Sequence, residues 1–510
     1  MALSKIHTGV CLGLKALLVD IEVDVSKTAD KPSLVIVGLP DAAVREAKER
    51  VLTAVKNSGV DISTLQCTVN LAPADLRKEG SLFDLPIAIA LLSSIGKLKK
   101  ESFQDYLVIG ELGLGGEIRY VPGALPLASL AKISKKKGII LPSINVKEAA
   151  LIPGIEVLGV DTLQQLVQHL NGGALLQIIT TSLSQQAHNE KRAPALDPVV
   201  DFAQIHGQQT AKRAMEIAAA GSHNILLSGP PGTGKSLLAK ALIGILPELE
   251  YDEALEVSEL HSIAGLTRTM SILARERPFR APHHTVSYAG LIGGGSSPRP
   301  GEVALAHRGV LFLDELPEFS RQVLEALREP LEERKITISR SLGSITFPAN
   351  FIFVCAMNPC PCGFLGHPEK PCRDSGLQIE RYQRKISGPL LDRIDLQVTV
   401  NALRSVDIHH GEPKESSNKV KMRVLAARQR QKERFGFTKT NAEMSVKEIE
   451  KYFPLSSSSK QILDNAIDTL HLSMRSYFRT IRTAATIADL DARNAISDED
   501  LFEALSYRTH

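Results

Sequence analysis

The amino-acid sequence predicts an α/β protein in which a doubly wound parallel sheet follows a separate α/β domain and precedes a helical one. Residues 1–172 alternate apolar strand-like runs with helical patterns, which is typical of a self-contained α/β domain. A glycine-rich loop at residues 229–236 lies between a short apolar run and an apolar helical pattern. Helical patterns fill the last part of the chain. At 510 residues the chain is too long for one core, and about three domains are expected.

Composition is that of a globular protein, with 43% hydrophobic and 23% charged residues. No apolar stretch approaches the roughly 20 residues that span a bilayer, and charges interrupt the first twenty positions. We therefore expect no signal peptide and no membrane segment. Six cysteines in so long a chain do not make a disulfide scaffold, which indicates the cytoplasm. The net charge of +3 neither requires nor excludes nucleic acid.

The chain divides into four predicted segments. An N-terminal domain is expected over residues 1–172 and a linker over 173–198, where glycine and polar clusters interrupt the patterns. The nucleotide domain is expected over 199–400 and a helical domain over 401–510. No internal repeat at a fixed period is found.

Two kinds of signal mark the helical domain. Ser445-x-x-Glu448 and Ser497-x-x-Asp500 are typical of helix starts. Residues 419–434 hold seven basic residues and one acidic one, with apolar residues at helical spacing that predict one packed face. The charged face is either solvated or contacts DNA or a nucleotide.

The loop at 229–236 fits G-x-x-x-x-G-K-[ST] in its expected strand–loop–helix context, which favours a nucleotide site over a turn that binds nothing. Glycines let the backbone wrap a phosphate, and the following helix directs free N–H groups at it. Lys235 would reach the β- and γ-phosphates of ATP, and Ser236 would ligate Mg²⁺. The predicted ATP-binding loop consists of Gly229, Pro230, Pro231, Gly232, Thr233, Gly234, Lys235 and Ser236.

A second motif follows the loop by about eighty residues. Gly309-Val-Leu-Phe-Leu-Asp-Glu315 places two carboxylates at the end of a buried strand, where open α/β sheets bind ligands. Asp314 would hold the Mg²⁺ shell and Glu315 would act as general base toward water. Many strands end in acidic turns, so this motif alone is weak evidence. Its presence together with the phosphate loop is what indicates a nucleotide site.

Two further polar residues suggest catalytic roles. Asn358 ends a third apolar run and could orient water opposite the γ-phosphate, or could simply occupy a turn. Arg393 lies in the otherwise apolar segment Ser387-Gly-Pro-Leu-Leu-Asp-Arg-Ile-Asp395. Its guanidinium could stabilise charge in a neighbouring subunit's active site. The alternative is a surface pair with Asp392.

These motifs occur in the order found in AAA+ ATPases, and the chain more narrowly resembles the magnesium-chelatase-like YifB/ComM family. The family-specific stretches are Gly38-Leu-Pro-Asp41, Arg280-Ala-Pro-His-His-Thr285, Asn358-Pro-Cys-Pro-Cys-Gly363 and the segment that ends at Arg393. They extend over most of the chain. The resemblance implies an AAA+ core with a helical lid.

The resemblance also implies residue roles. Asn358 matches the sensor-1 position, Arg393 the arginine finger and Arg475 the sensor-2 arginine of the lid. Adenine would lie against Ile205, His206 and Gly207. An arginine finger implies an active site completed by an adjacent subunit, and the family resemblance implies a homo-hexameric ring.

Two insertions resemble the elements that line the pore and grip DNA in related AAA+ proteins. Residues 262–300 form a helix-2 insert, and residues 335–346 alternate apolar and polar residues around Leu342-Gly343, which predicts a pre-sensor-1 hairpin. The alternative is a solvated loop and hairpin. Few aromatic residues accompany the cations, so sequence-independent phosphate contacts are favoured over base stacking. The candidate DNA contacts are Arg275, Arg277, Arg280, Lys335 and Arg340.

Three cysteines and one histidine crowd one loop: Cys360, Cys362, His367 and Cys372. Soft ligands this close in a cytoplasmic protein suggest structural Zn²⁺. Related proteins often carry a fourth cysteine, which this chain lacks. His367 or Asp374 could complete the site, or the loop could hold no metal.

The N-terminal domain resembles Lon-type proteases around Asp75–Pro86 and Gly110–Leu125. A Ser–Lys dyad needs a nucleophile beside a lysine of lowered pKa. The matching positions carry Phe83 and Leu125, and nearby Ser81 has no evident base. We expect a degenerate Lon-like domain that serves assembly or DNA guidance.

The predicted function is an ATP-driven ring helicase for DNA branch migration, as the family resemblance implies for recombination of incoming DNA during natural transformation. The main alternative is a remodelling or metal-chelatase motor that acts on a protein partner. An ATP-dependent protease is disfavoured by Phe83 and Leu125. No membrane partner is expected.

Overall fold

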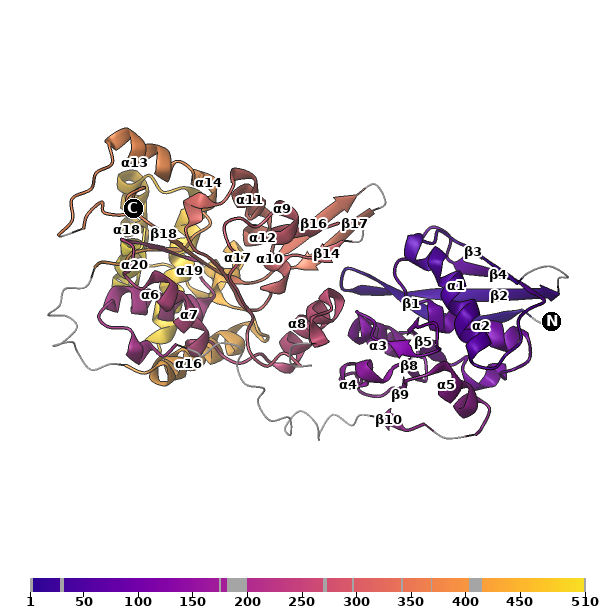
Figure 1. Cartoon of the computed structure of the whole chain (residues 1–510). Helices are drawn as coiled ribbons and strands as arrows, with labels where there is room; N and C mark the ends of the chain where they lie inside the picture. Colours follow the sequence, from indigo (N-terminus) through magenta and orange to yellow (C-terminus); the bar gives the residue numbers. More distant parts are fainter. Residues whose placement is uncertain are drawn as a thin grey trace.

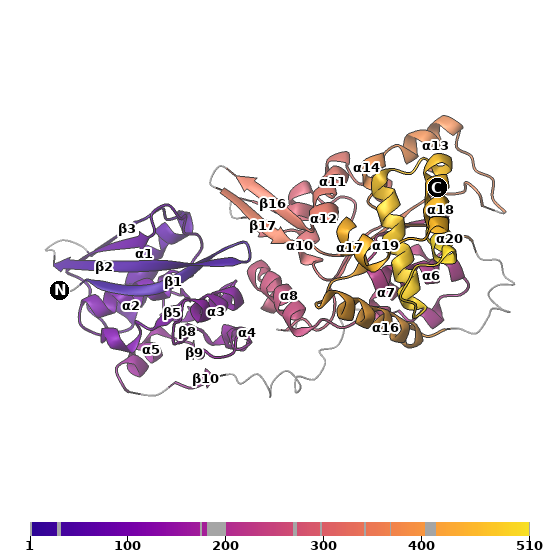
Figure 2. The same ribbon diagram turned by 180° about the vertical axis from the view of Figure 1, so that it is seen from behind.

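The computed structural model describes residues 3–27, 32–173, 176–180, 200–268, 273–295, 298–340, 343–367, 369–402 and 415–508. Most of the predicted linker and the interval 403–414 lie outside these residues. Figures 1 and 2 show an N-terminal and a C-terminal lobe, with one helix, α8 (Tyr251–Ala264), lying between them. Within the described residues, no helix is both long and apolar enough to cross a bilayer.

The N-terminal lobe is built on a mixed eight-stranded sheet of order β10-β9-β8-β5-β1-β2-β4-β3. β1 and β2 form an antiparallel hairpin that turns at Gly13, whose φ of 64° is readily adopted by glycine. Asp41 caps α1 by accepting a hydrogen bond from the N–H of Val44. The elements of this lobe are β1 Ser4–Leu12, β2 Lys15–Lys27, β3 Ser33–Val37, α1 Ala42–Asn57, β4 Leu65–Ala72, α2 Asp84–Ser94, β5 Tyr106–Val108, α3 Ala124–Ile133, β8 Gly138–Pro142, α4 Val146–Ala149, β9 Glu156–Val160, α5 Leu163–Leu170 and β10 Ile178–Thr180.

The two positions that match a protease dyad belong to the core of this lobe. Phe83 and Leu125 are both fully buried, and neither carries a nucleophile or a base. Ser81 donates a hydrogen bond to the carboxylate of Glu111. The Lon-like assignment of the lobe stays a prediction.

The C-terminal lobe contains the predicted parallel sheet, with strand order β12-β15-β18-β11-β19. Every neighbouring pair in it is parallel. β15 and β18 are buried along their whole length, which explains why they consist of continuous apolar runs. The bounds are β11 Ile225–Ser228, β12 Phe279–Arg280, β15 Val310–Leu313, β18 Ile352–Met357 and β19 Leu396–Thr399.

Helices cover this sheet and continue into the last part of the chain. The two predicted helix starts are confirmed, because Ser445 and Ser497 both form complete capping boxes. The predicted basic helix is α16, and it buries Val420 and Val424 against the lobe's core. The helices that the following sections use are α6 Gln209–Gly221, α7 Lys235–Ile245, α11 Arg321–Ala326, α12 Arg328–Glu333, α13 Gly376–Gln383, α14 Gly388–Leu391, α16 Ser417–Phe435, α17 Val446–Tyr452, α18 Ser457–Leu470, α19 Met474–Leu490 and α20 Asp498–Ser506.

The two lobes meet along α8. The N–H of Gly123, at the start of α3, donates to the carbonyl of Ser262 at 3.0 Å, and Ser129 donates to Glu259 at 3.2 Å. The Tyr251 hydroxyl donates to the carbonyl of Leu151 at 3.0 Å. One face of α3, with Gly123 just before it, therefore contacts α8.

The tip of the β1–β2 hairpin makes a second contact between the lobes. It lies against the hairpin of β16 (Lys335–Arg340) and β17 (Gly343–Pro348), whose antiparallel pairing confirms the predicted hairpin. A Cβ on Gly13 would lie 2.8 Å from the side chain of Ile345, so only glycine fits this approach. Leu14 packs into the apolar cluster beneath the hairpin.

Candidate nucleotide site

Three of the predicted nucleotide-site motifs share one edge of the parallel sheet. The phosphate loop follows β11, Asp314 and Glu315 follow β15, and Asn358 follows β18. Parallel strands in register end at the same edge, and this edge is where open α/β sheets bind their ligands. The three motifs therefore lie close together because each directly follows its strand.

The phosphate loop has the geometry of an anion cradle. Gly232 and Gly234 have φ of 79° and 89°, and a Cβ on either would meet nothing within 4 Å. Lys235 opens α7, so the N–H groups of its first turn face the loop. The residues present therefore fit a nucleotide phosphate.

Lys235 lies inside this cradle. Its Nζ donates to the carbonyls of Gly229 at 2.6 Å and Pro230 at 2.8 Å, and to Oδ1 of Asn358 at 3.2 Å. Burial lowers the pKa of Lys235. The ammonium is thus held by neutral oxygens, which a phosphate can replace as a stronger partner.

Ser236 and Asp314 form the expected magnesium pair. The hydroxyl of Ser236 donates to Oδ2 of Asp314 at 2.6 Å. Hydroxyl and carboxylate oxygens are the ligands that Mg²⁺ takes beside nucleotide phosphates. The donor set therefore fits the ion.

Glu315 is the exposed carboxylate of the site. Its side chain is 57% exposed, and its φ of 52° lies in the left-handed region, which costs about 1 kcal/mol for a residue with a side chain. This conformation directs the main chain at Glu315 away from the line of β15, which ends at Leu313. Its Oε2 lies 3.4 Å from Nδ1 of His284, a contact that the sequence motifs did not predict.

The predicted adenine segment lies between Phe202–Gln204 and α6. Ile205 is buried, and its carbonyl accepts a hydrogen bond from Lys212 at 2.6 Å. His206 and Gly207 follow, and Gly207 has φ of 55°. The role of this segment in adenine contact stays a prediction.

The two predicted arginines lie at the other edge of the sheet. β11 and β19 are parallel with Ile225 opposite Leu396, so Arg393 precedes β19 at the edge away from the phosphate loop. At about 3.3 Å per residue, it lies about 20 Å from the loop along the strands. The side chain of Arg393 cannot reach the nucleotide site of its own chain.

Arg393 and Arg475 share one carboxylate that the sequence motifs did not predict. Arg475 donates to Oε1 of Glu332 at 2.6 Å, and Arg393 donates to Oε2 of the same group. Burial acts to raise the pKa of Glu332, but the two arginines outweigh it, and the pKa is lowered overall. Glu332 is therefore the ionised partner of both guanidinium groups.

The cysteine loop brings together three sulfurs and a carboxylate. The Sγ atoms of Cys360, Cys362 and Cys372 lie 3.5–3.6 Å apart. Oδ2 of Asp374 lies 3.8 Å from the Sγ of Cys372 and accepts the N–H of Cys362. These four residues form a group that could hold a metal ion.

His367 is not part of this group. Its Nδ1 instead accepts the N–H groups of Glu369 and Lys370, both at 3.1 Å. Asp374, and not His367, lies with the three cysteines, which favours the predicted alternative in which Asp374 completes the site. Hydrogen bonds within its own turn determine where this imidazole points. The residue type alone does not predict these bonds.

The predicted DNA contacts fall into two groups. The guanidinium of Arg277 donates to Glu253 and to the carbonyls of Pro247 and Arg308, and Arg280 pairs with Glu302 at 2.6 Å. These two arginines are engaged within the chain. Arg275 and Lys335 are exposed, whereas the side chain of Arg340 lies outside the described residues.

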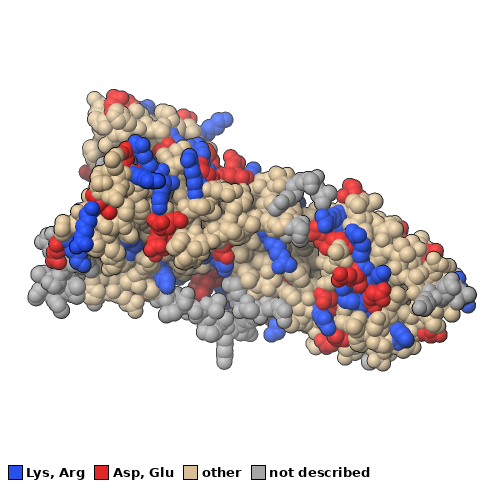
Figure 3. Space-filling view, turned by 45° about the horizontal axis from the view of Figure 1, so that its top comes forward, with Lys and Arg blue, Asp and Glu red and all other residues tan. Residues whose placement is uncertain are grey.

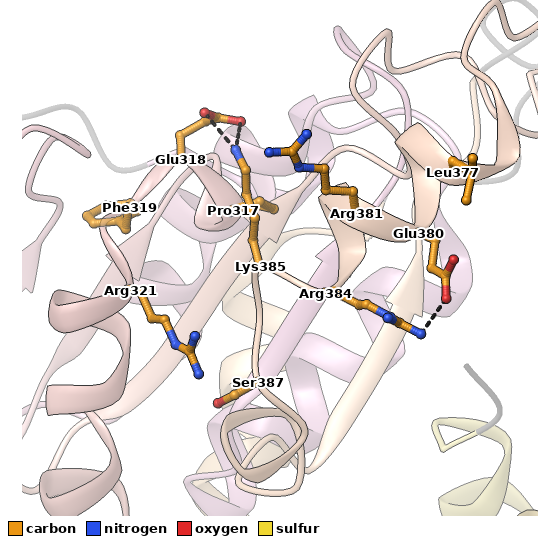
Figure 4. Close-up of a pocket in the computed structure, with 10 residues that line it drawn as sticks. All are labelled: Pro317, Glu318, Phe319, Arg321, Leu377, Glu380, Arg381, Arg384, Lys385 and Ser387. Carbon is orange, nitrogen blue, oxygen red and sulfur yellow. Dashed lines mark hydrogen bonds and ion pairs between the residues drawn. The ribbon is translucent and has the colours of Figure 1, made fainter.

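A cavity of about 710 Å³ lies close to the site (Figure 4). It opens between the turn after Glu315 and the segment of α13 and α14. Lys385 pairs with Glu318 at 3.4 Å and Arg384 with Glu380 at 2.5 Å. Across the part of the chain that the structure describes, Arg321 and Arg381 have no ion-pair or hydrogen-bond partner, and both side chains line the cavity.

On the face drawn in Figure 3, the charged surface is mixed in sign. Figure 3 shows basic and acidic side chains lying beside one another over both lobes. On the basic helix α16, Arg423 pairs with Glu216 and Glu415, and Arg434 pairs with Asp489. Much of its charge is therefore paired within the chain, which disfavours the predicted contact with DNA or a nucleotide.

Comparison with protein families agrees with the fold and the site. The model "Subunit ChlI of Mg-chelatase" matches residues 21–145, and "Magnesium chelatase, subunit ChlI" matches residues 201–408. "Magnesium chelatase, subunit ChlI C-terminal" matches residues 414–508. The fold and the site define a magnesium-chelatase-like AAA+ protein.

Full-length relatives narrow this class. The chain is 43% identical to Competence protein ComM of Haemophilus influenzae, over 100% of the chain and 98% of that protein. It is 42% identical to the uncharacterized protein YifB of Escherichia coli, over 100% of the chain and 97% of the relative. The Magnesium-chelatase 38 kDa subunit of Rhodobacter capsulatus is 26% identical over 42% of the chain and 63% of that subunit. The chain belongs to the ComM/YifB family.

Proposed function

We propose that the protein is an ATP-dependent, ring-forming DNA motor that promotes branch migration during recombination of incoming DNA. The observation that carries the proposal is the split between two edges of one sheet. Phosphate-binding and hydrolytic residues lie at one edge, and two arginines suited to phosphate lie at the other. Such a chain needs a second copy to complete each active site.

Each residue at the first edge has a distinct role in hydrolysis. Lys235 binds the β- and γ-phosphates, and Ser236 and Asp314 hold Mg²⁺, which supplies charge neutralisation when bound. Glu315 takes a proton from the attacking water, since it is the exposed carboxylate of the set. Asn358, 3.2 Å from Lys235 Nζ, orients that water.

The second edge serves the neighbouring subunit. Arg393 and Arg475 stabilise charge that develops on the neighbour's γ-phosphate. A homo-hexamer is the assembly that the family resemblance implies. The distance of about 20 Å between Arg393 and its own phosphate loop supports action between subunits.

DNA is the proposed substrate of the motor. Arg275, Lys335 and Arg340 supply cations from the insert and the hairpin, and the cavity adds Arg321 and Arg381. Contacts to phosphates carry no sequence information, as a motor that moves along DNA requires. The name Competence protein of the Haemophilus relative supports a role in natural transformation.

We propose structural Zn²⁺ at the cysteine loop. Zn–S bonds of about 2.3 Å in a tetrahedron separate the sulfurs by about 3.8 Å, close to the 3.5–3.6 Å between these Sγ atoms. Asp374 is the fourth ligand. The ion would fix the chain that leads from Asn358 to α13.

A protein-remodelling motor is the second candidate. The chelatase family models support it, because they cover all three parts of the chain. Such a motor would need a partner protein for stimulation, whereas a DNA motor would need DNA.

The experiment that separates the two candidates is the steady-state ATPase rate of the full chain with and without forked DNA. The proposed function predicts stimulation by DNA in the absence of any other protein. A rate that neither single-stranded nor duplex nor forked DNA changes would contradict it.

A further inference from the structure

Three charged side chains meet on the C-terminal lobe, outside the nucleotide site of the same chain. Glu332 lies in the last turn of α12, Arg393 lies between α14 and β19, and Arg475 lies in the first turn of α19. Each carboxylate oxygen of Glu332 serves one arginine. The cluster carries two positive charges and one negative charge, so it retains affinity for an anion.

The two arginines form a pair whose spacing is set by α19. Arg479, one turn after Arg475 on this helix, donates to the carbonyl of Arg393 at 2.9 Å and to Asp395 at 2.7 Å. Arg475 is itself part of α19. The helix therefore fixes the main chain at both arginines, whatever occupies the space between their guanidinium groups.

Glu332 is well placed to be exchanged for another anion. Its side chain is 42% exposed and that of Arg475 is 41% exposed, so an anion can approach from solvent. Arg393 is only 6% exposed, its Nη1 donates to the carbonyl of Pro389, and its Nε has no hydrogen-bond partner among the residues that the structure describes. A phosphate offers three oxygens and up to two negative charges, which suits two arginines better than one carboxylate does.

We propose that Glu332 is an internal stand-in for the γ-phosphate of ATP bound to a second copy of this chain. In the free chain Glu332 holds Arg393 and Arg475 together and neutralises one of their charges. When the ring closes, the partner's γ-phosphate takes its place, and Glu332 is released to solvent. Glu332 is thus a positioning residue that makes ring closure depend on a bound triphosphate.

This inference rests on the proposed function, because it requires two copies to share an active site. Glu332 competes with the partner's γ-phosphate for the two arginines. The apparent affinity between subunits is therefore lower than the contacts between the arginines and the phosphate alone would give. A nucleoside diphosphate lacks the displacing group and leaves Glu332 in place.

The test uses the full-length chain and the variant Glu332→Gln, which keeps the shape of the side chain and removes its charge. The measurement is the fraction of rings, by mass photometry, against the concentration of a non-hydrolysable ATP analogue. We expect the midpoint to fall about five- to tenfold in Glu332→Gln. The matched control is Glu333→Gln, which alters the neighbouring exposed residue. Within the described part of the chain Glu333 pairs with Lys335 alone, so the midpoint of this variant should equal that of the unaltered chain.

A second variant shows whether Glu332 acts through the arginines. In a chain that already carries Arg393→Ala and Arg475→Ala, adding Glu332→Gln should not change the midpoint. An unchanged midpoint in Glu332→Gln would overturn the inference while leaving the proposed function intact. An increase in the midpoint would also overturn it, because Glu332 would then help the arginines to bind. Absence of triphosphate-dependent rings in the unaltered chain would remove both proposals.

Discussion

Ser236 and Asp314 are joined by a hydrogen bond of 2.6 Å between Oγ and Oδ2, although they are 78 positions apart in the chain. Ser236 lies in the first turn of α7, and Asp314 lies directly after β15. β18 separates the two strands that lead to them, so the contact depends on parallel order in the whole sheet. This bond marks the place at which a magnesium ion would join the two motifs.

Glu315→Gln should separate binding from hydrolysis. The amide keeps the size of the side chain but accepts no proton, so ATP turnover should fall by about 10²–10⁴-fold while ATP binding persists. Turnover by phosphate release and binding by a fluorescent ATP analogue measure the two effects. Glu318→Gln, three positions further on and 45% exposed, is the control and should retain turnover. Equal turnover in both variants would exclude Glu315 as the base.

Arg321→Ala/Arg381→Ala should weaken DNA binding. These arginines make no ion pair or hydrogen bond within the described chain, so their loss removes charge without breaking such a contact. The slope of log affinity against log salt should fall by about 2, and basal ATPase should stay unchanged. Arg119→Ala/Arg328→Ala removes the same charge from ion-paired sites and should keep the slope. An unchanged slope in the cavity variant would place the DNA elsewhere.

Asp374→Ala should lower the zinc content of the purified chain. Metal analysis should give one zinc per unaltered chain, and the variant should lose the ion to a chelator at concentrations at least tenfold lower. Asp374→Cys should retain the ion because thiolate is a good zinc ligand. His367→Ala is the control, since its imidazole bonds its own turn. Zinc loss in His367→Ala but not in Asp374→Ala would reverse the assignment.

Acid should loosen the packing of α19 on the sheet through His223. This side chain is fully buried, donates to or accepts from Thr486 at 2.7 Å, and burial lowers its pKa to about 4. The unfolded chain binds a proton near pH 6.5 while the folded chain does not, so stability falls as the pH drops from 6.5 to 4. The loss from this group is about 3 kcal/mol, at 1.36 kcal/mol per pH unit.

His223→Gln should remove most of this pH dependence. The free energy of unfolding is measured by urea titration, with hydrogen exchange in α19 as the readout. Between pH 6.5 and 4 it should change less in this variant than in the unaltered chain. His471→Asn alters an exposed residue with φ of 52°, a conformation that asparagine adopts, and is the control. The same slope in all three proteins would show that His223 is not the titrating group.

The nucleotide site was largely predictable because local patterns determine it. Apolar runs that end at Asp314 and Asn358 identify strands, and parallel strands place their ends at one edge. The partners of Arg393 and Arg277 were not predictable. Glu332 lies 61 positions from Arg393, and Glu253 lies 24 positions from Arg277, with no motif that joins them. Ion pairs between elements depend on how helices pack, which a single sequence does not encode as a pattern.

The contacts between the two lobes likewise could not be predicted from the sequence. The family resemblance predicted a degenerate protease-like lobe, but it gave no indication of how this lobe contacts the rest of the chain. Gly123 and Ser129 attach α3 to α8, and Gly13 lies against the β16–β17 hairpin. The N-terminal lobe therefore contacts both elements that carry predicted DNA-binding insertions, which supports a role in guiding DNA.

The ATPase rate of the full chain with forked DNA, measured beside its mass with and without nucleotide, tests the central claim most directly. The account predicts that ATP shifts the chain from a small species to a ring and that forked DNA raises the rate. Arg393→Ala should raise the ATP concentration that ring formation needs and should abolish the stimulated rate. Mixing it with Lys235→Ala should restore part of the rate, because each variant supplies what the other lacks. A chain that hydrolyses ATP equally well as a monomer, without response to DNA, would contradict the account.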